Sequence, residues 1–131
     1  MYHSKIAGLG YYVPENIVTN DDLSKCIDTN DAWIQERTGI LERRHVIRGE
    51  DTTTSMGVKA AKIAIERSGV AKEEIDFIIF ATLSPDYYFP GPGVLVQRDL
   101  GLRTVGALDV RNQCSGFVYA LSIADQYIKT G

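Results

Sequence analysis

The stretch "TVGALDVRNQCSGFVYAL", residues 104–121, sets the fold class because it joins two different hydrophobic patterns. Its first part, residues 104–110, is a short apolar run of the kind that forms a strand covered on both faces. From Cys114 to about Thr130 the apolar residues recur at helical spacing, and Gly131 follows them. We therefore expect a buried strand that leads directly into a helix at Cys114.

The region before this stretch has the same strand-and-helix pattern. Residues 75–83 ("IDFIIFATL") form a second apolar run, and the prolines and glycines of residues 84–93 indicate a loop. Helical spacing follows over residues 92–101, where Pro92 suits the first turn, and another helix is expected within residues 52–69. Strand, helix, strand and helix in this order indicate parallel pairing in a layered α/β sheet flanked by helices.

The N-terminal third is expected to hold shorter elements. Residues 5–13 predict a first strand, and residues 40–48 predict an exposed one. Two short helices are expected within residues 19–27 and 30–39, and the spacing of the first places Cys26 on its core face. The candidate N-caps are Thr19 or Asn20 and Asn30 or Asp31, and Gly39 is the candidate helix stop. No linker interrupts the sequence, so we expect one domain over residues 1–131.

Composition excludes several functional classes. The chain has 131 residues, a net charge of −3 and 44% hydrophobic residues, which is typical of one globular domain. An acidic balance argues against a dedicated nucleic-acid binder, and no apolar run is long enough for a signal peptide or a membrane span. The two cysteines form no CxxC pair, so no metal site is expected. A cytoplasmic location follows by default.

Cys114 lies where a catalytic nucleophile would be well placed. A residue at a strand-to-helix junction faces the crevice beyond the strand's carboxyl end, where ligands bind in open α/β sheets. The helix N-terminus stabilises a thiolate there, and Ser115 and Gly116 leave room for a substrate. A buried structural cysteine is the alternative, and position and neighbours alone leave the two interpretations open.

Longer matches connect the chain to a known family. The segments that carry the match are "GLGYYVPENIVTNDDL", "DTNDAWIQERTGILERR", "TTTSMGVKAAKIAIE", "IDFIIFATLSPDYYFPGPG", "LGLRTVGALDV" and "DVRNQCSGFVYALSIADQYIKTG". In this order they resemble the β-ketoacyl-acyl-carrier-protein synthase III family, the condensing enzymes that start bacterial fatty-acid synthesis. The resemblance implies a thiolase-like fold, which is built from two similar halves. It identifies residues 1–131 as the N-terminal half, with a layered mixed sheet flanked by helices.

The resemblance also implies a reaction. Cys114 matches the cysteine that takes an acyl group from acetyl-CoA or another short acyl-CoA as a thioester. The backbone N–H of Cys114 matches one donor of the oxyanion hole. The acyl group then passes to the carbanion that forms when malonyl-acyl-carrier protein loses carbon dioxide. No metal or redox cofactor is implied, because the thioester and the released carbon dioxide drive the chemistry.

Further binding residues are implied by matched positions. Trp33 and Arg37 match residues that contact the adenine end of coenzyme A, with Thr29 and Thr38 nearby. An indole that stacks on a purine and a guanidinium beside phosphate are sound chemistry for those side chains. Phe89 matches a loop residue that reaches the acyl pocket of a partner subunit, which implies a homodimer.

Two departures from the family limit the expected activity. Asn112 and Gln113 stand where many relatives have small residues, which bears on the shape of the acyl pocket. The family's second half supplies a histidine and an asparagine for the decarboxylation, and neither His3 nor His45 lies in a matching motif. We therefore expect no condensation by this chain alone. A non-catalytic coenzyme A-binding or dimerisation module and a relative with other acyl-CoA substrates remain as alternatives.

Overall fold

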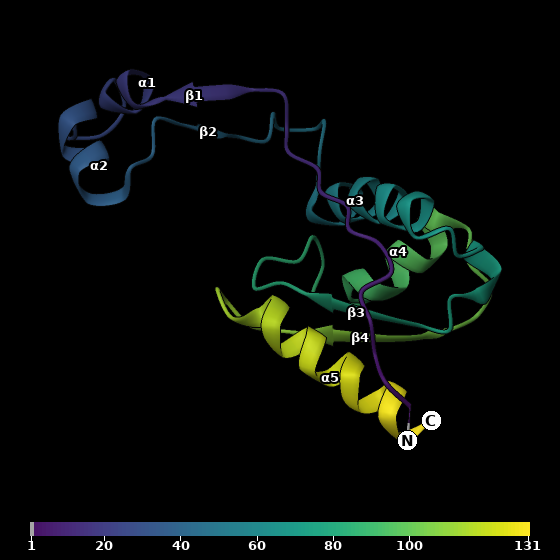
Figure 1. Cartoon of the computed structure of the whole chain (residues 1–131). Coiled ribbons are helices and arrows are strands. Elements are labelled where there is room, and N and C mark those ends of the chain that lie inside the picture. The colour runs from purple at the N-terminus through teal and green to yellow at the C-terminus, as the bar shows by residue number, and fades with distance from the viewer. Residues whose placement is uncertain (1) are drawn as a thin grey trace. The chain divides into compact units, whose positions relative to one another are not determined.

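The computed structural model describes residues 2–131 (Figure 1). Two compact units make up the chain, and they are described separately. Unit 1 consists of residues 2–12 together with Thr53–Gly131, and unit 2 consists of Val13–Thr52. None of the helices in this described part of the chain has the length and apolar character needed to cross a membrane.

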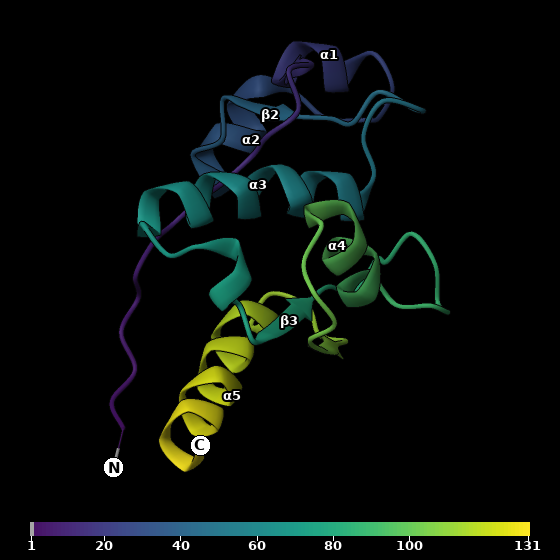
Figure 2. The same ribbon diagram turned by 90° about the vertical axis from the view of Figure 1, so that its right-hand side faces the viewer.

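Unit 1 has a three-layered α/β arrangement. Its two strands pair in parallel, with Ile79 opposite Leu108. Helices α3 and α4 pack together on one face of the strand pair, and α5 lies on the other face (Figures 1 and 2). The elements are α3 (Thr53–Ser68), the short 3₁₀ helix η1 (Lys72–Glu74), β3 (Phe77–Ala81), α4 (Pro92–Leu100), β4 (Gly106–Val110) and α5 (Gly116–Thr130).

Local sequence signals set the ends of α3 and α4. Pro92 occupies the first turn of α4, where its missing N–H costs no hydrogen bond. Gly101 ends α4 in the left-handed conformation, with φ of 64°. Gly69 follows α3 with φ of 68°. The parallel pairing and the Pro92 start that the sequence predicts are therefore confirmed.

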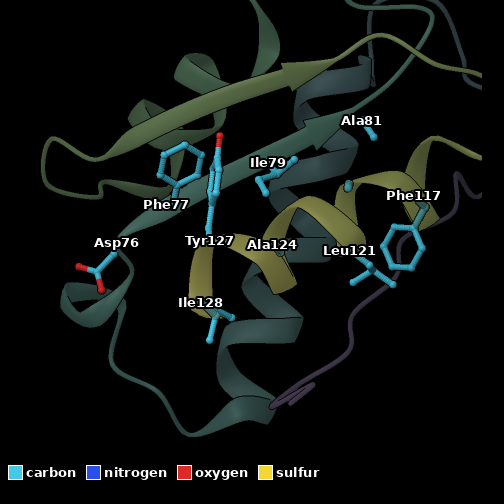
Figure 3. Close-up of a pocket in the computed structure, with 10 residues that line it drawn as sticks. Asp76, Phe77, Ile79, Ala81, Phe117, Leu121, Ala124, Tyr127 and Ile128 are labelled. Carbon is cyan, nitrogen blue, oxygen red and sulfur yellow. The ribbon is translucent and has the colours of Figure 1, made fainter. Parts of the chain in front are cut away.

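The buried core of unit 1 is small. Within residues 2–131, its buried apolar side chains are Val58 on α3, Val96 on α4 and Ala120 on α5. Much larger side chains on α5 stay exposed, among them Phe117 at 65%. Together with the near face of β3 they line an apolar groove of about 450 Å³ (Figure 3). In this groove the rings of Phe77 and Tyr127 meet edge to face, with centroids 5.1 Å apart.

Unit 2 is built around one buried amide. The Asn20 side chain is 1% exposed, and its Nδ2 donates to Asp31 Oδ1 at 2.7 Å and to the Ile40 carbonyl at 2.8 Å. Its Oδ1 accepts from Arg43 Nη2 at 2.5 Å. These bonds join α1 (Asn20–Ser24), α2 (Asp31–Thr38) and β2 (Glu42–Arg44). Arg43 Nη1 also donates to the Val18 carbonyl at 3.1 Å, which connects β1 (Ile17–Thr19) to the same group. Strands β1 and β2 pair antiparallel, with Val18 opposite Arg43.

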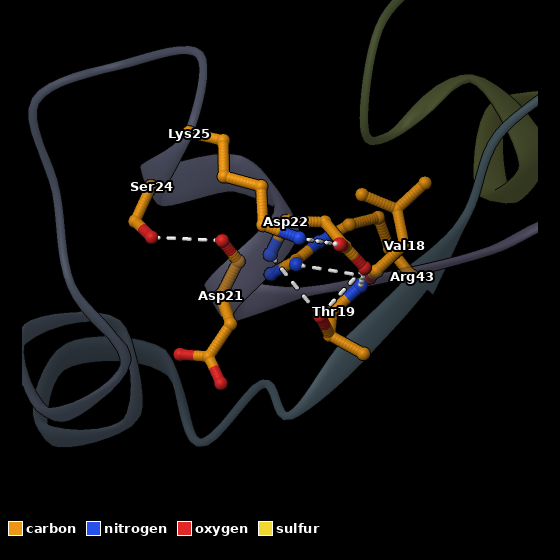
Figure 4. A network of polar contacts seen from close by, with 7 residues as sticks. All are labelled: Val18, Thr19, Asp21, Asp22, Ser24, Lys25 and Arg43. Atoms are coloured by element: carbon orange, nitrogen blue, oxygen red, sulfur yellow. Dashed lines mark hydrogen bonds and ion pairs between the residues drawn. The ribbon is translucent and has the colours of Figure 1, made fainter.

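A capping box starts α1 (Figure 4). Thr19 Oγ1 accepts from the Asp22 N–H at 3.1 Å, and the Asp22 carboxylate accepts from the Thr19 N–H at 3.1 Å. Lys25 Nζ donates to the same carboxylate at 2.8 Å. The hydrogen bond from Lys25, followed by those from Thr19, holds the pKa of Asp22 well below its ordinary value.

Two expectations from the sequence are wrong. Residues 5–13 form no strand, because Gly8 and Gly10 lie directly against the backbone of α3, where any Cβ would overlap carbonyl oxygens of Ala64 and Ala60. Cys26 is exposed and not in the core, since α1 ends at Ser24 before the helical spacing reaches it.

Other expectations from the N-terminal third agree with the structure. Thr19 and Asn30 are the N-caps, and Gly39 ends α2 with φ of 70°. The exposed strand expected within residues 40–48 is present as β2. Taken with the parallel pair of β3 and β4 in unit 1, the parallel and antiparallel pairings occur in two separate two-stranded sheets and not in one mixed sheet.

We predict that Asn20→Ala destabilises unit 2 by about 2 kcal/mol, because it removes three partly buried hydrogen bonds of the amide. Native-state hydrogen exchange of the amides in α1 and α2 measures the change. Asn16→Ala is the matched control, since no hydrogen bond involves the Asn16 side chain in the described structure, and it should change stability by less than about 0.5 kcal/mol. Equal effects of both substitutions would contradict the role of Asn20.

Unit 2 should also lose stability in acid. The pKa of Asp22 is lower in the folded state than in the unfolded chain, so its stabilising contribution is complete above about pH 5 and is lost as pH falls through the folded value. Hydrogen exchange in α1 should therefore accelerate between about pH 5 and about pH 2, after correction for intrinsic rates. Asp22→Asn should weaken this dependence without removing it, because hydrogen bonds from Gln35 and Asn20 also lower the pKa of Asp31. An unchanged pH dependence in Asp22→Asn would refute the prediction.

Candidate functional site

Cys114 lies in a turn between a strand and a helix. Strand β4 ends at Val110, α5 begins at Gly116, and the Gly116 N–H donates to the Gln113 carbonyl at 2.9 Å across the turn. The thiol is free and exposed. In this structure Cys114 is therefore not a buried structural cysteine, which was the alternative that the sequence left open.

Cys114 lies directly before the N-cap of α5. Ser115 is the N-cap, and its side chain makes no capping hydrogen bond to the helix. The N–H groups of a first helical turn point out of the helix end, and with the helix dipole they favour negative charge there. The first turn of α5 can therefore stabilise negative charge on an oxyanion that develops next to Cys114.

Gly116 fixes the position of the turn. It is buried, and a Cβ at this residue would lie 3.5 Å from the Ala81 Cβ at the end of β3 and 3.4 Å from the Asn112 Cβ. These are ordinary van der Waals distances, so the first residue of α5 packs closely against the end of β3.

An aromatic loop lies at the same edge of the strand pair. We use this name for residues 82–91, which join β3 to α4 and carry Tyr87, Tyr88 and Phe89. Phe89 is 93% exposed, and the peptide bond between Phe89 and Pro90 is cis. The guanidinium carbon of Arg111 lies 4.6 Å from the ring centre of Tyr88. A cavity of about 350 Å³ lies between the loop and the end of β4.

The other predicted contact residues belong to unit 2. On α2 the guanidinium carbon of Arg37 lies 4.4 Å above the ring centre of Trp33, which is 50% exposed. Glu36 approaches the Arg37 guanidinium at 3.4 Å in an exposed ion pair. This pair of side chains, which we call the Trp33–Arg37 stack, presents an indole and a cation at the surface.

Thr29 and Thr38 have different hydrogen-bonding states. The hydroxyl of Thr29 is buried and has no hydrogen-bond partner in the described structure. The hydroxyl of Thr38 donates to the Ile34 carbonyl at 2.7 Å and accepts from the Ile40 N–H at 3.1 Å. The Thr29 hydroxyl is thus unpaired but enclosed by the protein, whereas the Thr38 hydroxyl is committed to backbone groups.

The structure groups the predicted residues into two sets, one in each unit. Cys114 and Phe89 belong to unit 1, and Thr29, Trp33, Arg37 and Thr38 belong to unit 2. Both histidines are exposed, His3 in unit 1 and His45 in unit 2. Within residues 2–131 no three Asp, Glu, His or Cys side chains gather in a way that could hold a metal ion.

Sequence reasoning missed three polar residues around the aromatic loop: Asp86, Asp109 and Arg111. Asp86 bonds to Thr53 and Thr54, and Asp109 bonds to Gly93. Arg111 contacts the ring of Tyr88. All these partners are distant in sequence, so no local spacing could have indicated the contacts.

Comparisons with known proteins give the geometry a family context. A sequence model described as 3-oxoacyl-[acyl-carrier-protein] synthase III matches residues 108–131, which include Cys114 and α5. A β-ketoacyl-[acyl-carrier-protein] synthase III from Xanthomonas euvesicatoria is 49% identical over 129 residues, or 98% of this chain. The crystal structure of 3-oxoacyl-[acyl-carrier-protein] synthase III from Aquifex aeolicus covers 97% of this chain with a TM-score of 0.91 and 50% identity. Over nearly its whole length, this chain is similar to 3-oxoacyl-[acyl-carrier-protein] synthase III proteins.

The solved structures of this family confirm the expected α/β, thiolase-like fold class. The priming β-ketosynthase of the R1128 polyketide biosynthetic pathway is also similar, with a TM-score of 0.94, 35% identity and coverage of 99% of this chain. The chain spans 39% of the length of the Xanthomonas relative, 41% of the Aquifex chain and 39% of the polyketide-priming chain. The comparisons thus relate this chain to part of each relative.

We predict that Gly116→Ala is tolerated and raises the free energy of unfolding by up to about 1 kcal/mol, because the added methyl group meets ordinary contacts and alanine favours the helix. Gly39→Ala is the contrasting control: nothing lies within 4 Å of its Cβ position, but its φ of 70° strains any other residue. It should destabilise the protein by about 1 kcal/mol. Urea denaturation measures both, and a destabilising Gly116→Ala would show that the turn has no room for a methyl group.

Proposed function

We propose that this chain supplies the nucleophile of a 3-oxoacyl-[acyl-carrier-protein] synthase III that initiates fatty-acid synthesis. Acetyl-CoA or another short acyl-CoA is the acyl donor, and malonyl-acyl-carrier protein is the acceptor in the whole enzyme. The observation that carries the proposal is the exposed free thiol of Cys114, in the turn between β4 and α5, within the residues that the family model matches.

The first half-reaction is an acyl transfer. The Cys114 thiolate attacks the carbonyl carbon of the acyl-CoA thioester, and a carbon–sulfur bond forms while the carbonyl oxygen gains the negative charge. The backbone N–H of Cys114 and the uncapped first turn of α5 favour that charge. When the carbonyl re-forms, the bond to coenzyme A breaks, and its thiolate leaves and takes a proton from water.

The Trp33–Arg37 stack is the proposed site for the adenine end of coenzyme A. The indole is half exposed, so a purine can stack on the pair while the guanidinium lies near phosphate. Thr29 would border the same ligand, although its hydroxyl is buried in this structure. We propose that Thr38 borders this site and that its hydroxyl, already bonded to backbone, keeps the end of α2 in place.

The second half-reaction needs groups beyond those described here. Condensation in the family uses a histidine and an asparagine, and neither His3 nor His45 lies in a motif that matches this histidine. We therefore propose that Cys114 holds the acyl group for catalytic residues elsewhere in the protein. Residues 1–131 would then act as the N-terminal half-domain of a cytoplasmic homodimer. In that dimer Phe89, on the aromatic loop, would reach the partner's acyl pocket.

A second candidate is a relative that accepts a different primer. Asn112 and Gln113 come directly before Cys114 and add bulk next to the thiol. The fold is shared with a priming enzyme of polyketide synthesis. Acyl-CoA chain length distinguishes this candidate from the first, because both use the same cysteine.

Incubation with acetyl-CoA followed by intact-mass analysis tests the proposal. We expect one acetyl group on the chain, none on Cys114→Ala, and unchanged labelling of Cys26→Ala, the matched control because Cys26 is also a free and exposed thiol. A folded chain that reacts with neither acetyl-CoA nor longer acyl-CoA would instead favour a non-catalytic module.

Arg37→Ala should raise the acetyl-CoA concentration needed for the half-maximal rate by roughly tenfold and leave the maximal rate unchanged, as expected for lost binding alone.

A further inference from the structure

The aromatic loop carries exposed side chains on an anchored backbone. Phe89 is 93% exposed, and Tyr87 and Tyr88 are exposed as well, so packing of their rings does little to hold the loop. A loop with so few buried contacts is ordinarily mobile. The position of Phe89 must therefore depend on hydrogen bonds that hold the backbone on either side of it.

Asp86 anchors the start of the loop to α3. Its Oδ1 accepts from the Thr53 N–H at 2.7 Å, and its Oδ2 accepts from the Thr54 N–H at 2.8 Å. The Thr53 hydroxyl donates to the Ser84 carbonyl at 2.8 Å, which is a third hydrogen bond between α3 and the loop. A carboxylate on the first turn of a helix gains from charge-assisted hydrogen bonds and from the helix dipole.

Asp109, on β4, holds the start of α4 directly after the loop. Its Oδ1 accepts from the Gly93 N–H at 2.8 Å, in the first turn of α4. Its carboxylate lies so close to Gly91 that any Cβ there would overlap it. Between these anchors, the Arg111 guanidinium lies 4.6 Å from the Tyr88 ring centre. Phe89 thus stands between two carboxylate anchors.

We propose that Asp86 and Asp109 are positioning residues that fix the aromatic loop and thereby set which acyl-chain lengths Cys114 accepts. The proposal rests on the proposed function, because it needs acyl transfer to Cys114 and a homodimer in which Phe89 of one subunit lines the acyl pocket of the other. Asp86 lies three residues before Phe89, and Gly91 lies two residues after it, so release of either anchor displaces the ring. A displacement of about 1 Å in a side chain that lines an acyl pocket alters the rate of acyl transfer by roughly one to two orders of magnitude.

The test compares acylation of Cys114 by acetyl-CoA and by octanoyl-CoA, measured by intact mass over time. Asp86→Ala and Phe89→Ala should each change the ratio of the two rates by roughly tenfold in the same direction. The double variant should match Phe89→Ala alone, because Asp86 acts through that ring. Asp109→Ala should shift the ratio in the same direction. Asp86→Asn keeps one acceptor oxygen and should restore part of the wild-type ratio.

Glu73→Ala is the control, since Glu73 is an exposed acid on η1 away from the loop, and it should leave the ratio unchanged. Hydrogen exchange supplies a second measurement: Asp86→Ala should accelerate exchange in residues 84–91 and leave α5 protected, which shows that the variant is folded. Additive effects in the double variant, or an unchanged ratio or unchanged loop exchange in Asp86→Ala, overturn the positioning role while the proposed function stands. A wild-type chain that neither acyl-CoA labels overturns both.

Discussion

The parallel pairing of β3 and β4 is the constraint on which the site in unit 1 depends. In the ladder Ala81 lies opposite Val110, and the Thr82 N–H donates to the Val110 carbonyl at 3.1 Å, so both strands end at the same level. The chain leaves β3 into the aromatic loop and leaves β4 into the turn of Cys114, and both exits lie at one edge. Antiparallel strands would have sent these two segments to opposite ends. The contact between Arg111 and Tyr88 follows from this shared edge.

Sequence patterns predicted the elements whose signals are local. The apolar runs of β3 and β4, the proline start of α4 and the caps of α1 and α2 each depend on residues within a few positions of one another. Residues 5–13 have a strand-like composition, but a strand needs a partner, and the glycines of this segment instead lie against α3. Whether a partner strand exists is a non-local fact that no window of sequence contains.

The same distinction applies to the functional residues. The strand-to-helix junction pointed to Cys114, and the proposed coenzyme A contacts rest on the resemblance to the family and not on spacing. The four-residue spacing of Trp33 and Arg37 on one helix could have indicated their stacking, because side chains at i and i+4 are neighbours. Asp86 could not have been found in this way, since its partners Thr53 and Thr54 lie more than thirty positions away.

The stack on α2 has a thermodynamic consequence for any flat ring that binds there. A free tryptophan and a free arginine each sample several rotamers, and fixing them on binding costs roughly 0.5–1.5 kcal/mol per side chain. Here the guanidinium already lies 4.4 Å above the indole, so much of that rotational freedom is lost during folding. A ring that stacks on this pair meets a surface whose shape is set in advance, and its association has a correspondingly smaller entropic penalty.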